Sequence, residues 1–172
     1  MCNEKIAPII RFAVMSDIHI KDEPSAESER FKKGIADAYK IARSGETYKK
    51  LDALVLDGDI ATSGSEAQMQ MAKEIIDNGL DYDETKLIIS VASHEYNHEN
   101  GGVEGALEKL KRIFNAAPDV HEVINGFHFV SASPSKSCDF NDDNIKWIYD
   151  NLETANKDDP KKPVLMFHNP HI

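Results

Sequence analysis

The sequence predicts an α/β fold in which short buried strands alternate with amphipathic helices. Residues 9–15, 51–56 and 87–92 form apolar runs with the length and composition of strands that are covered on both faces. Apolar residues recur at helical spacing between these runs, an order typical of strand–helix–strand units in a largely parallel sheet. Asn125-Gly126 separates two further apolar runs and predicts an antiparallel hairpin.

Four helices and a last strand complete the predicted pattern. In the first helix, Phe31, Ile35 and Tyr39 lie about one turn apart and mark the buried face. The second helix opens at Ser65, which stands three residues before Gln68 as in a capping box. Three helices are expected at about residues 27–43, 65–78 and 103–114, and the strand at residues 163–167. Apolar residues at positions 145, 148, 149 and 152 mark a fourth helix, which Asp142 and Asp143 would cap.

Length and composition predict one globular domain that spans residues 1–172. Hydrophobic residues make up 41% of the chain and charged residues 29%, which are ordinary values for a soluble protein. No apolar run approaches the roughly 20 residues of a membrane span, so we expect a cytoplasmic protein that does not bind membranes. Cys2 and Cys138 are too few for a disulfide framework.

The formal net charge of −10 argues against a broad nucleic-acid-binding surface, because polyanions usually bind to a basic face. A small phosphate ester remains a compatible substrate, since bound divalent cations dominate the electric field at their own site. The sequence leaves the oligomeric state open.

Metal-binding types of side chain follow four of the predicted strands directly. Because the carboxyl ends of parallel strands meet at one edge of a sheet, where ligands bind, we expect these side chains to converge. In chain order they are Asp17 and His19, then Asp57 and Asp59, then His94 and Glu95, and finally His168 and His171.

Carboxylate and imidazole groups suit Mn²⁺, Fe or Zn²⁺ better than Ca²⁺. Asp17 and His19 stand two residues apart, so strand alternation would place both side chains on one side of the chain. A carboxylate such as that of Asp59 can bridge two ions about 3.5–4 Å apart, and such a pair clamps a phosphoryl group and activates water. Gly58 permits a tight turn beside the ions. These features predict two divalent metal ions at this edge.

The ordered motifs Asp17-x-His19, Gly58-Asp59, His94-Glu95 and His168 resemble those of the calcineurin-like metallophosphoesterases. The resemblance covers nearly the whole chain, and four motifs in order are far more specific than any one of them. It implies two mixed β-sheets packed as a sandwich and flanked by helices. It also implies metal-dependent hydrolysis of phosphate esters by a hydroxide activated at a binuclear metal centre, for which manganese is one candidate metal.

The resemblance implies a role for each matching residue. Asp17 and His19 would bind the first ion, Asp59 would bridge both ions, and His168 would bind the second. His94 would contact the phosphate or protonate the leaving oxygen, and Glu95 would orient His94.

The third motif departs from the family pattern, which has an asparagine ligand before the histidine. Ser93 occupies that position, and its shorter, neutral side chain predicts a weaker second metal site. Asn97 and His98 offer an alternative register three residues later, followed by Glu99. We favour the first register, because it follows the predicted strand directly.

The family also ends its site with a Gly-His-x-His motif, which does not follow His168 here. We therefore expect a domain that is incomplete at its C-terminus, with His171 as a weak candidate for one vacant ligand position. An alternative function follows from both departures: a catalytically impaired metal-binding or regulatory module on the same fold. Substrate identity, among monoesters, diesters, nucleotides and phosphoproteins, is not predicted.

Overall fold

A computed structural model describes residues 7–136 and 139–169 of the chain. None of the helices in these residues is long and apolar enough to cross a membrane. The elements follow one another in this order: β1 (Phe12–Met15), α1 (Ala26–Arg43), β2 (Ala53–Asp57), α2 (Glu66–Gly79), β3 (Lys86–Ser90), the 3₁₀ turn η1 (His98–Asn100), α3 (Gly102–Phe114), β4 (Asp119–Ile124), β5 (Phe127–Ala132), α4 (Asp142–Asp158) and β6 (Leu165–Phe167).

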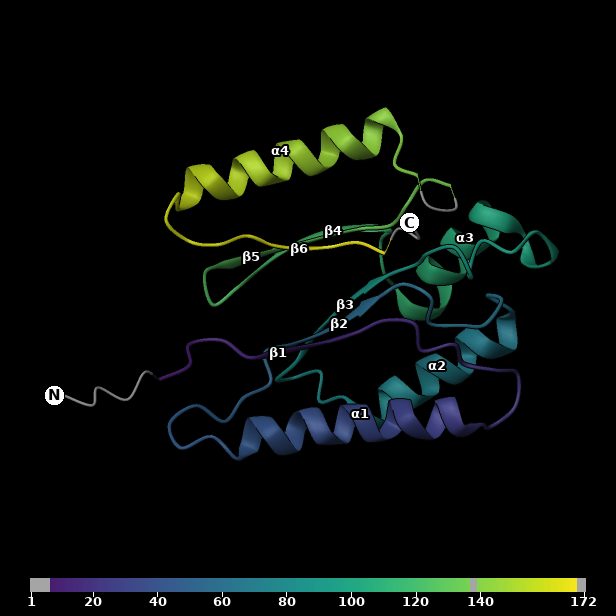
Figure 1. The fold of residues 1–172 in the computed structure, drawn as a ribbon, viewed down its shortest axis with the longest axis horizontal. Coiled ribbons are helices and arrows are strands. Elements are labelled where there is room, and N and C mark those ends of the chain that lie inside the picture. The colour runs from purple at the N-terminus through teal and green to yellow at the C-terminus, as the bar shows by residue number, and fades with distance from the viewer. Residues whose placement is uncertain (1–6, 137–138, 170–172) are drawn as a thin grey trace, which may run out of the picture.

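The strands form two sheets of three strands each, which face one another in the middle of the molecule (Figure 1). The first sheet has the order β1-β2-β3 and is parallel throughout. In the second, β4 and β5 form the predicted antiparallel hairpin, and β6 pairs parallel with β5. Helices α1 and α2 cover the outer face of the first sheet, and α4 covers the outer face of the second (Figure 1). The predicted α/β sandwich is therefore confirmed, with the antiparallel pair confined to the second sheet.

Strand β2 is apolar at its first four positions, residues 53–56, because both of its faces are covered. Leu54 and Leu56 pack into the core between the first sheet and its helices. Ala53 and Val55 point the other way, into the layer between the two sheets. Because successive side chains of a strand point to opposite faces, a strand in the middle of a sandwich needs apolar residues on both.

Helices α1 and α2 begin where hydroxyl side chains cap them. Ser25 accepts a hydrogen bond from Ser28 N–H, and Ser65 accepts one from Gln68 N–H, as predicted. The second half of the predicted capping box is not formed, because the Gln68 side chain bonds to Ser63 and Asp22 instead.

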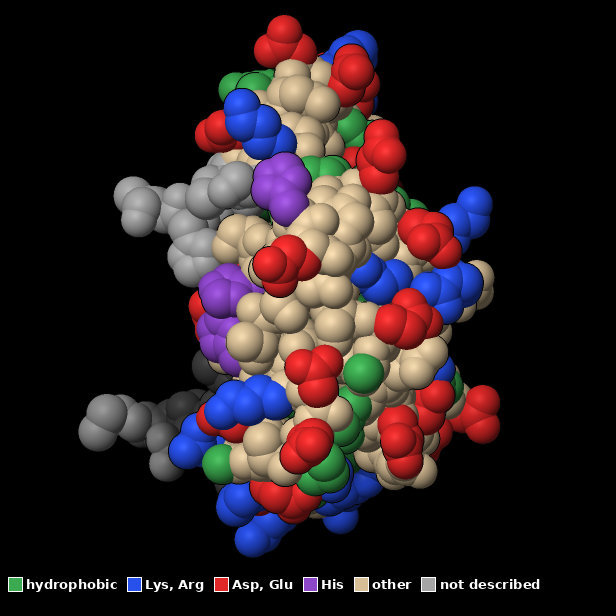
Figure 2. All heavy atoms as spheres, turned by 90° about the vertical axis from the view of Figure 1, so that its right-hand side faces the viewer, with side chains coloured by type: hydrophobic (Ala, Val, Ile, Leu, Met, Phe, Trp, Pro, Cys, Tyr) green, Lys and Arg blue, Asp and Glu red, His purple; other side chains and the backbone are tan. Residues whose placement is uncertain are grey.

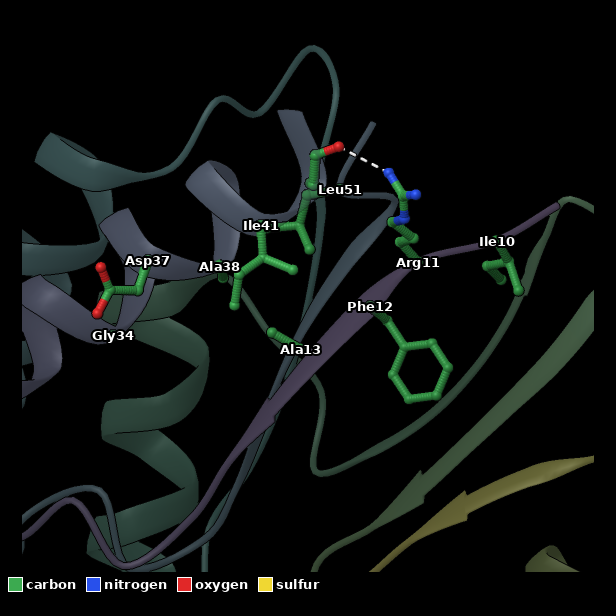
Figure 3. Close-up of a pocket in the computed structure, with 10 residues that line it drawn as sticks. Ile10, Arg11, Phe12, Ala13, Gly34, Asp37, Ala38, Ile41 and Leu51 are labelled. Atoms are coloured by element: carbon green, nitrogen blue, oxygen red, sulfur yellow. Dashed lines mark hydrogen bonds between the residues drawn. The ribbon is translucent and has the colours of Figure 1, made fainter. Parts of the chain in front are cut away.

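Strand β1 begins at Phe12, three residues later than the apolar run, and Arg11 lies just before it. The guanidinium group of Arg11 donates hydrogen bonds to the carbonyl oxygens of Ala42, in the last turn of α1, and of Tyr48. The charged residue that interrupts the apolar run therefore joins the start of β1 to the end of α1 and to the loop that follows it. The cavity of about 540 Å³ in Figure 3 adjoins Arg11, near the amino-terminal ends of β1 and β2.

Candidate metal centre

The carboxyl ends of β1, β2, β3 and β6 point toward the same end of the molecule (Figure 1). Figure 2 looks onto this end and shows histidine side chains on its surface, with acidic side chains around them. The candidate residues follow these strands closely in sequence, so the sheet topology itself brings them to one face.

The loops that follow β1 and β2 are joined by main-chain hydrogen bonds. Asp17 N–H donates to Gly58 C=O at 3.3 Å, and His19 N–H donates to Asp59 C=O at 3.1 Å. Asp17, His19 and Asp59 all have left-handed backbone, with φ of 53°, 55° and 49°. This conformation costs about 1–2 kcal/mol for a non-glycine residue, and it occurs at active sites as well as in turns and at helix ends.

The left-handed backbone corrects one step of the sequence argument. Asp17 and His19 were expected side by side through strand alternation, but β1 ends at Met15 and both residues lie in a turn beyond it. Their positions are therefore set by the pairing of the two loops and not by the pleat of a strand.

Three of the predicted residues form a compact cluster of metal-binding atoms. His19, Asp59 and His94 each contribute one such atom, and all three atoms lie within 4.8 Å of one another. The Asp59 side chain is fully buried, and the two imidazole rings are partly exposed, with centroids 4.5 Å apart. The residues come from the loops after β1, β2 and β3.

The segment after β3 fixes one oxygen of the Asp59 carboxylate. Asp59 Oδ1 accepts a hydrogen bond from His94 N–H at 3.0 Å and a longer one from the Ser93 hydroxyl at 3.5 Å. Charge-assisted hydrogen bonds of this kind hold a carboxylate in a defined orientation.

The imidazole of His94 is oriented by a main-chain carbonyl. His94 Nδ1 lies 2.7 Å from Thr62 C=O, which only accepts hydrogen bonds, so Nδ1 carries the hydrogen and Nε2 is the nitrogen left to act at the cluster. The Thr62 hydroxyl also donates to His19 C=O at 2.9 Å, so this residue connects the two histidines. No sequence pattern identifies Thr62, because its contact with His94 is made by the main chain.

Glu95 lies beneath the cluster and is fully buried. Its carboxylate accepts hydrogen bonds from the N–H groups of Asp59, Ala61 and Ala92, at 3.1, 2.8 and 2.9 Å. Burial raises the pKa of Glu95 to about 7, against the lowering effect of the N–H donors of Ala61 and Ala92. Glu95 thus fastens the main chain at Asp59 and Ala92, two residues before His94, whereas the sequence argument expected it to orient the ring.

Asp17 and His168 are not members of the cluster but border a second carboxylate, Asp57. Burial raises the pKa of Asp57, and the negative charge of Asp17 raises it further, whereas the Ser90 hydroxyl and His168 lower it. The Asn169 side chain donates to Asp57 C=O at 2.8 Å and so joins the end of β6 to the end of β2.

The residues of the alternative register are not members of the cluster. Asn97 caps the η1 turn, where its side-chain oxygen accepts from Glu99 N–H at 2.9 Å, and His98 is exposed. Ser93 and His94, in contrast, contact Asp59. His171 lies outside the described residues.

A cavity of about 380 Å³ opens beside Asp17 and His19. Glu27, Arg30 and Phe31 of α1 also line it. This cavity offers room for a small molecule next to the cluster.

The donor set fits a divalent metal ion. One carboxylate and two imidazoles are common ligands of Zn²⁺ and of Fe²⁺, and three protein ligands leave coordination positions for water or substrate.

Residues 10–172 match the family model described as Calcineurin-like phosphoesterase. A comparison with curated proteins found no match.

Proposed function

This chain is a member of the calcineurin-like phosphoesterase family, and from this membership we propose that it hydrolyses small phosphate esters at the cluster of His19, Asp59 and His94. Metal-dependent hydrolysis of phosphate esters is the activity of the family. The observation that carries the proposal for this chain is the convergence of three metal-binding side chains, from three separate strand ends, within 4.8 Å.

The chain's own residues have distinct tasks in the proposed reaction. His19, Asp59 and His94 would hold the cation, and Glu95 would keep the main chain of Asp59 in place. A divalent cation bound there supplies stabilisation of negative charge on the phosphoryl group and lowers the pKa of water. His94 acts through Nε2, either at the ion or at the leaving oxygen, because Nδ1 is engaged with Thr62.

The binuclear centre implied by the family resemblance requires further metal ligands. It needs Asp17 at the first ion, His168 at the second and Asp59 between them. Asp17 and His168 lie near Asp57, which supports their presence on the rim of the site. Their direct contact with an ion remains a prediction, as does manganese as the metal.

Hydrolysis can be tested with Asp59→Asn. We expect the parent chain, loaded with Mn²⁺ or Zn²⁺, to hydrolyse 4-nitrophenyl phosphate or bis(4-nitrophenyl) phosphate, and EDTA to stop the reaction. Asp59→Asn should lower kcat/KM by about 100-fold or more, since even residues that only support metal ligands are worth about 10–100-fold. Asp83→Asn, at an exposed aspartate, is the matched control and should match the parent.

A second candidate function is a metal-binding or regulatory module with impaired catalysis. Ser93 favours it, because a serine stands where the family has an asparagine ligand. A chain that binds metal through Asp59 but hydrolyses neither monoesters nor diesters would support this alternative.

A cytoplasmic location is also part of the proposal, and cell fractionation would test it.

A further inference from the structure

We infer that the described residues build a site for one divalent ion, held by His19, Asp59 and His94, in place of the two-ion centre bridged by Asp59. The inference concerns the ion count and the ligands, and it relies on the proposed function only for the expectation that the ion serves hydrolysis.

The hydrogen bonds accepted by the Asp59 carboxylate favour a single ion. A carboxylate that bridges two ions must offer each oxygen to a metal, and each oxygen has about two lone-pair directions. Asp59 Oδ1 already accepts hydrogen bonds from His94 N–H and from the Ser93 hydroxyl. An ion bound at Oδ1 would have to displace one of these two donors, and the His94 N–H is held in place by the fold of the third loop.

The second argument is the absence of a second ligand set. Within residues 7–136 and 139–169, His19, Asp59 and His94 form the only group of three or more histidine, cysteine or acidic side chains close enough to share an ion. Asp17 and His168, the further ligands that the family resemblance implies, are outside this group, and both interact with the Asp57 carboxylate. The Asn97 amide, which the alternative register would use, is engaged by Glu99 N–H.

The third argument is the place of His94. The family resemblance puts this residue at the phosphate, without a bond to metal. Here the Thr62 carbonyl accepts the hydrogen of Nδ1, and His94 has a metal-binding atom within 4.8 Å of those of His19 and Asp59. Two imidazoles and one carboxylate make a complete ligand set for Zn²⁺ or Fe²⁺ with open positions for substrate.

The test is the number of bound ions in two variants for which the one-ion and two-ion sites predict opposite results. The purified full chain is dialysed to equilibrium against Zn²⁺, and bound zinc is measured by mass spectrometry. We expect about one ion in the parent, about one in His168→Ala, and a loss of most bound zinc in His94→Ala. A two-ion site would give two ions in the parent, a loss of one in His168→Ala, and little change in His94→Ala, and this pattern would overturn the inference.

Two controls show whether a loss of bound zinc comes from the loss of a ligand or from unfolding. Thermal melts show whether each variant is folded, and His94→Gln replaces the ring by an amide that can still donate to the Thr62 carbonyl. His94→Gln should also lose zinc, and a folded His94→Gln with parent-like zinc would contradict the inference. In parallel, Mn²⁺-loaded parent should give the electron paramagnetic resonance spectrum of isolated ions, whereas a spin-coupled spectrum would indicate a pair.

Phosphoester turnover measured on the same samples separates this inference from the proposed function. One ion per chain without turnover would leave the ion count standing and reject hydrolysis. Turnover with two ions per chain would support hydrolysis and reject the one-ion site.

Discussion

At the scale of single residues, the site depends on how Asp59 is held. Its backbone is in the left-handed region, its main-chain N–H is bonded to Glu95, and one carboxylate oxygen is bonded to the third loop. Both hydrogen bonds come from adjacent residues of the loop after β3, so one segment fixes Asp59 before any ion binds. A ligand that is fixed in advance loses little conformational entropy on binding.

Glu95 should therefore contribute strongly to stability, which Glu95→Gln tests. The amide NH₂ of glutamine would replace an oxygen that accepts N–H groups and would face one or two donors within the buried site. We expect the free energy of unfolding to fall by about 1–3 kcal/mol, as for other buried groups left without a partner. Urea denaturation at pH 8, above the pKa of about 7, measures the change for the ionised side chain.

The control for this substitution is Glu74→Gln, at an exposed position of α2. It should alter the free energy of unfolding by less than about 0.5 kcal/mol, as is usual for surface changes. Equal effects of the two substitutions would mean that the three hydrogen bonds of Glu95 add nothing to stability.

At the scale of elements, helices were easier to predict than strand ends. Their periodic apolar faces and the Ser65 cap lie within one continuous segment, so the sequence carries the signal locally. Strand β1 starts later than its apolar run because the Arg11 side chain binds carbonyls at residues 42 and 48. Such boundaries depend on tertiary partners, which single-sequence patterns do not contain.

The turn after β2 allows a prediction on glycine. Gly58 has φ of +69°, and an added Cβ atom would lie 2.5 Å from Ala92 Cβ and 3.0 Å from Asn169 Cβ. Gly58→Ala should lower the free energy of unfolding by about 1–2 kcal/mol for the backbone strain and by about 1–3 kcal/mol more for the steric overlap. It should also weaken metal binding, because Asp59 follows directly.

Gly102→Ala is the matched control, and chemical denaturation of both variants measures the difference. Gly102 has a similar φ of +62°, but an added Cβ atom there would meet only His98 Nδ1, at 4.0 Å. The free energy of unfolding of this variant should therefore fall only by the cost of the backbone strain, about 1–2 kcal/mol. If the two alanine variants were equally stable, close packing at Gly58 would not matter.

At the scale of the whole molecule, the sequence predicted where the site lies better than it predicted which residues meet. The parallel order of strands sends their carboxyl ends to one edge, and this follows from topology alone. Whether Asp17 or His94 joins His19 and Asp59 depends on the left-handed turns and on the carbonyl of Thr62. Those are main-chain features, and the side-chain pattern of the sequence does not record them.

Metal binding should stabilise the entire fold, because the three clustered residues come from loops after three different strands. An ion that binds only the folded chain adds about 2.7 kcal/mol to the free energy of unfolding at a concentration 100-fold above Kd. For a domain of this size the gain corresponds to a rise in Tm of roughly 5–11 °C. Differential scanning calorimetry with Zn²⁺ or Mn²⁺ measures the shift, and EDTA should reverse it.

Asp59→Asn should lose most of the shift, whereas Asp83→Asn should keep it. A rise of equal size in all three chains would place the stabilising ion elsewhere, on the acidic surface of a molecule with a formal net charge of −10.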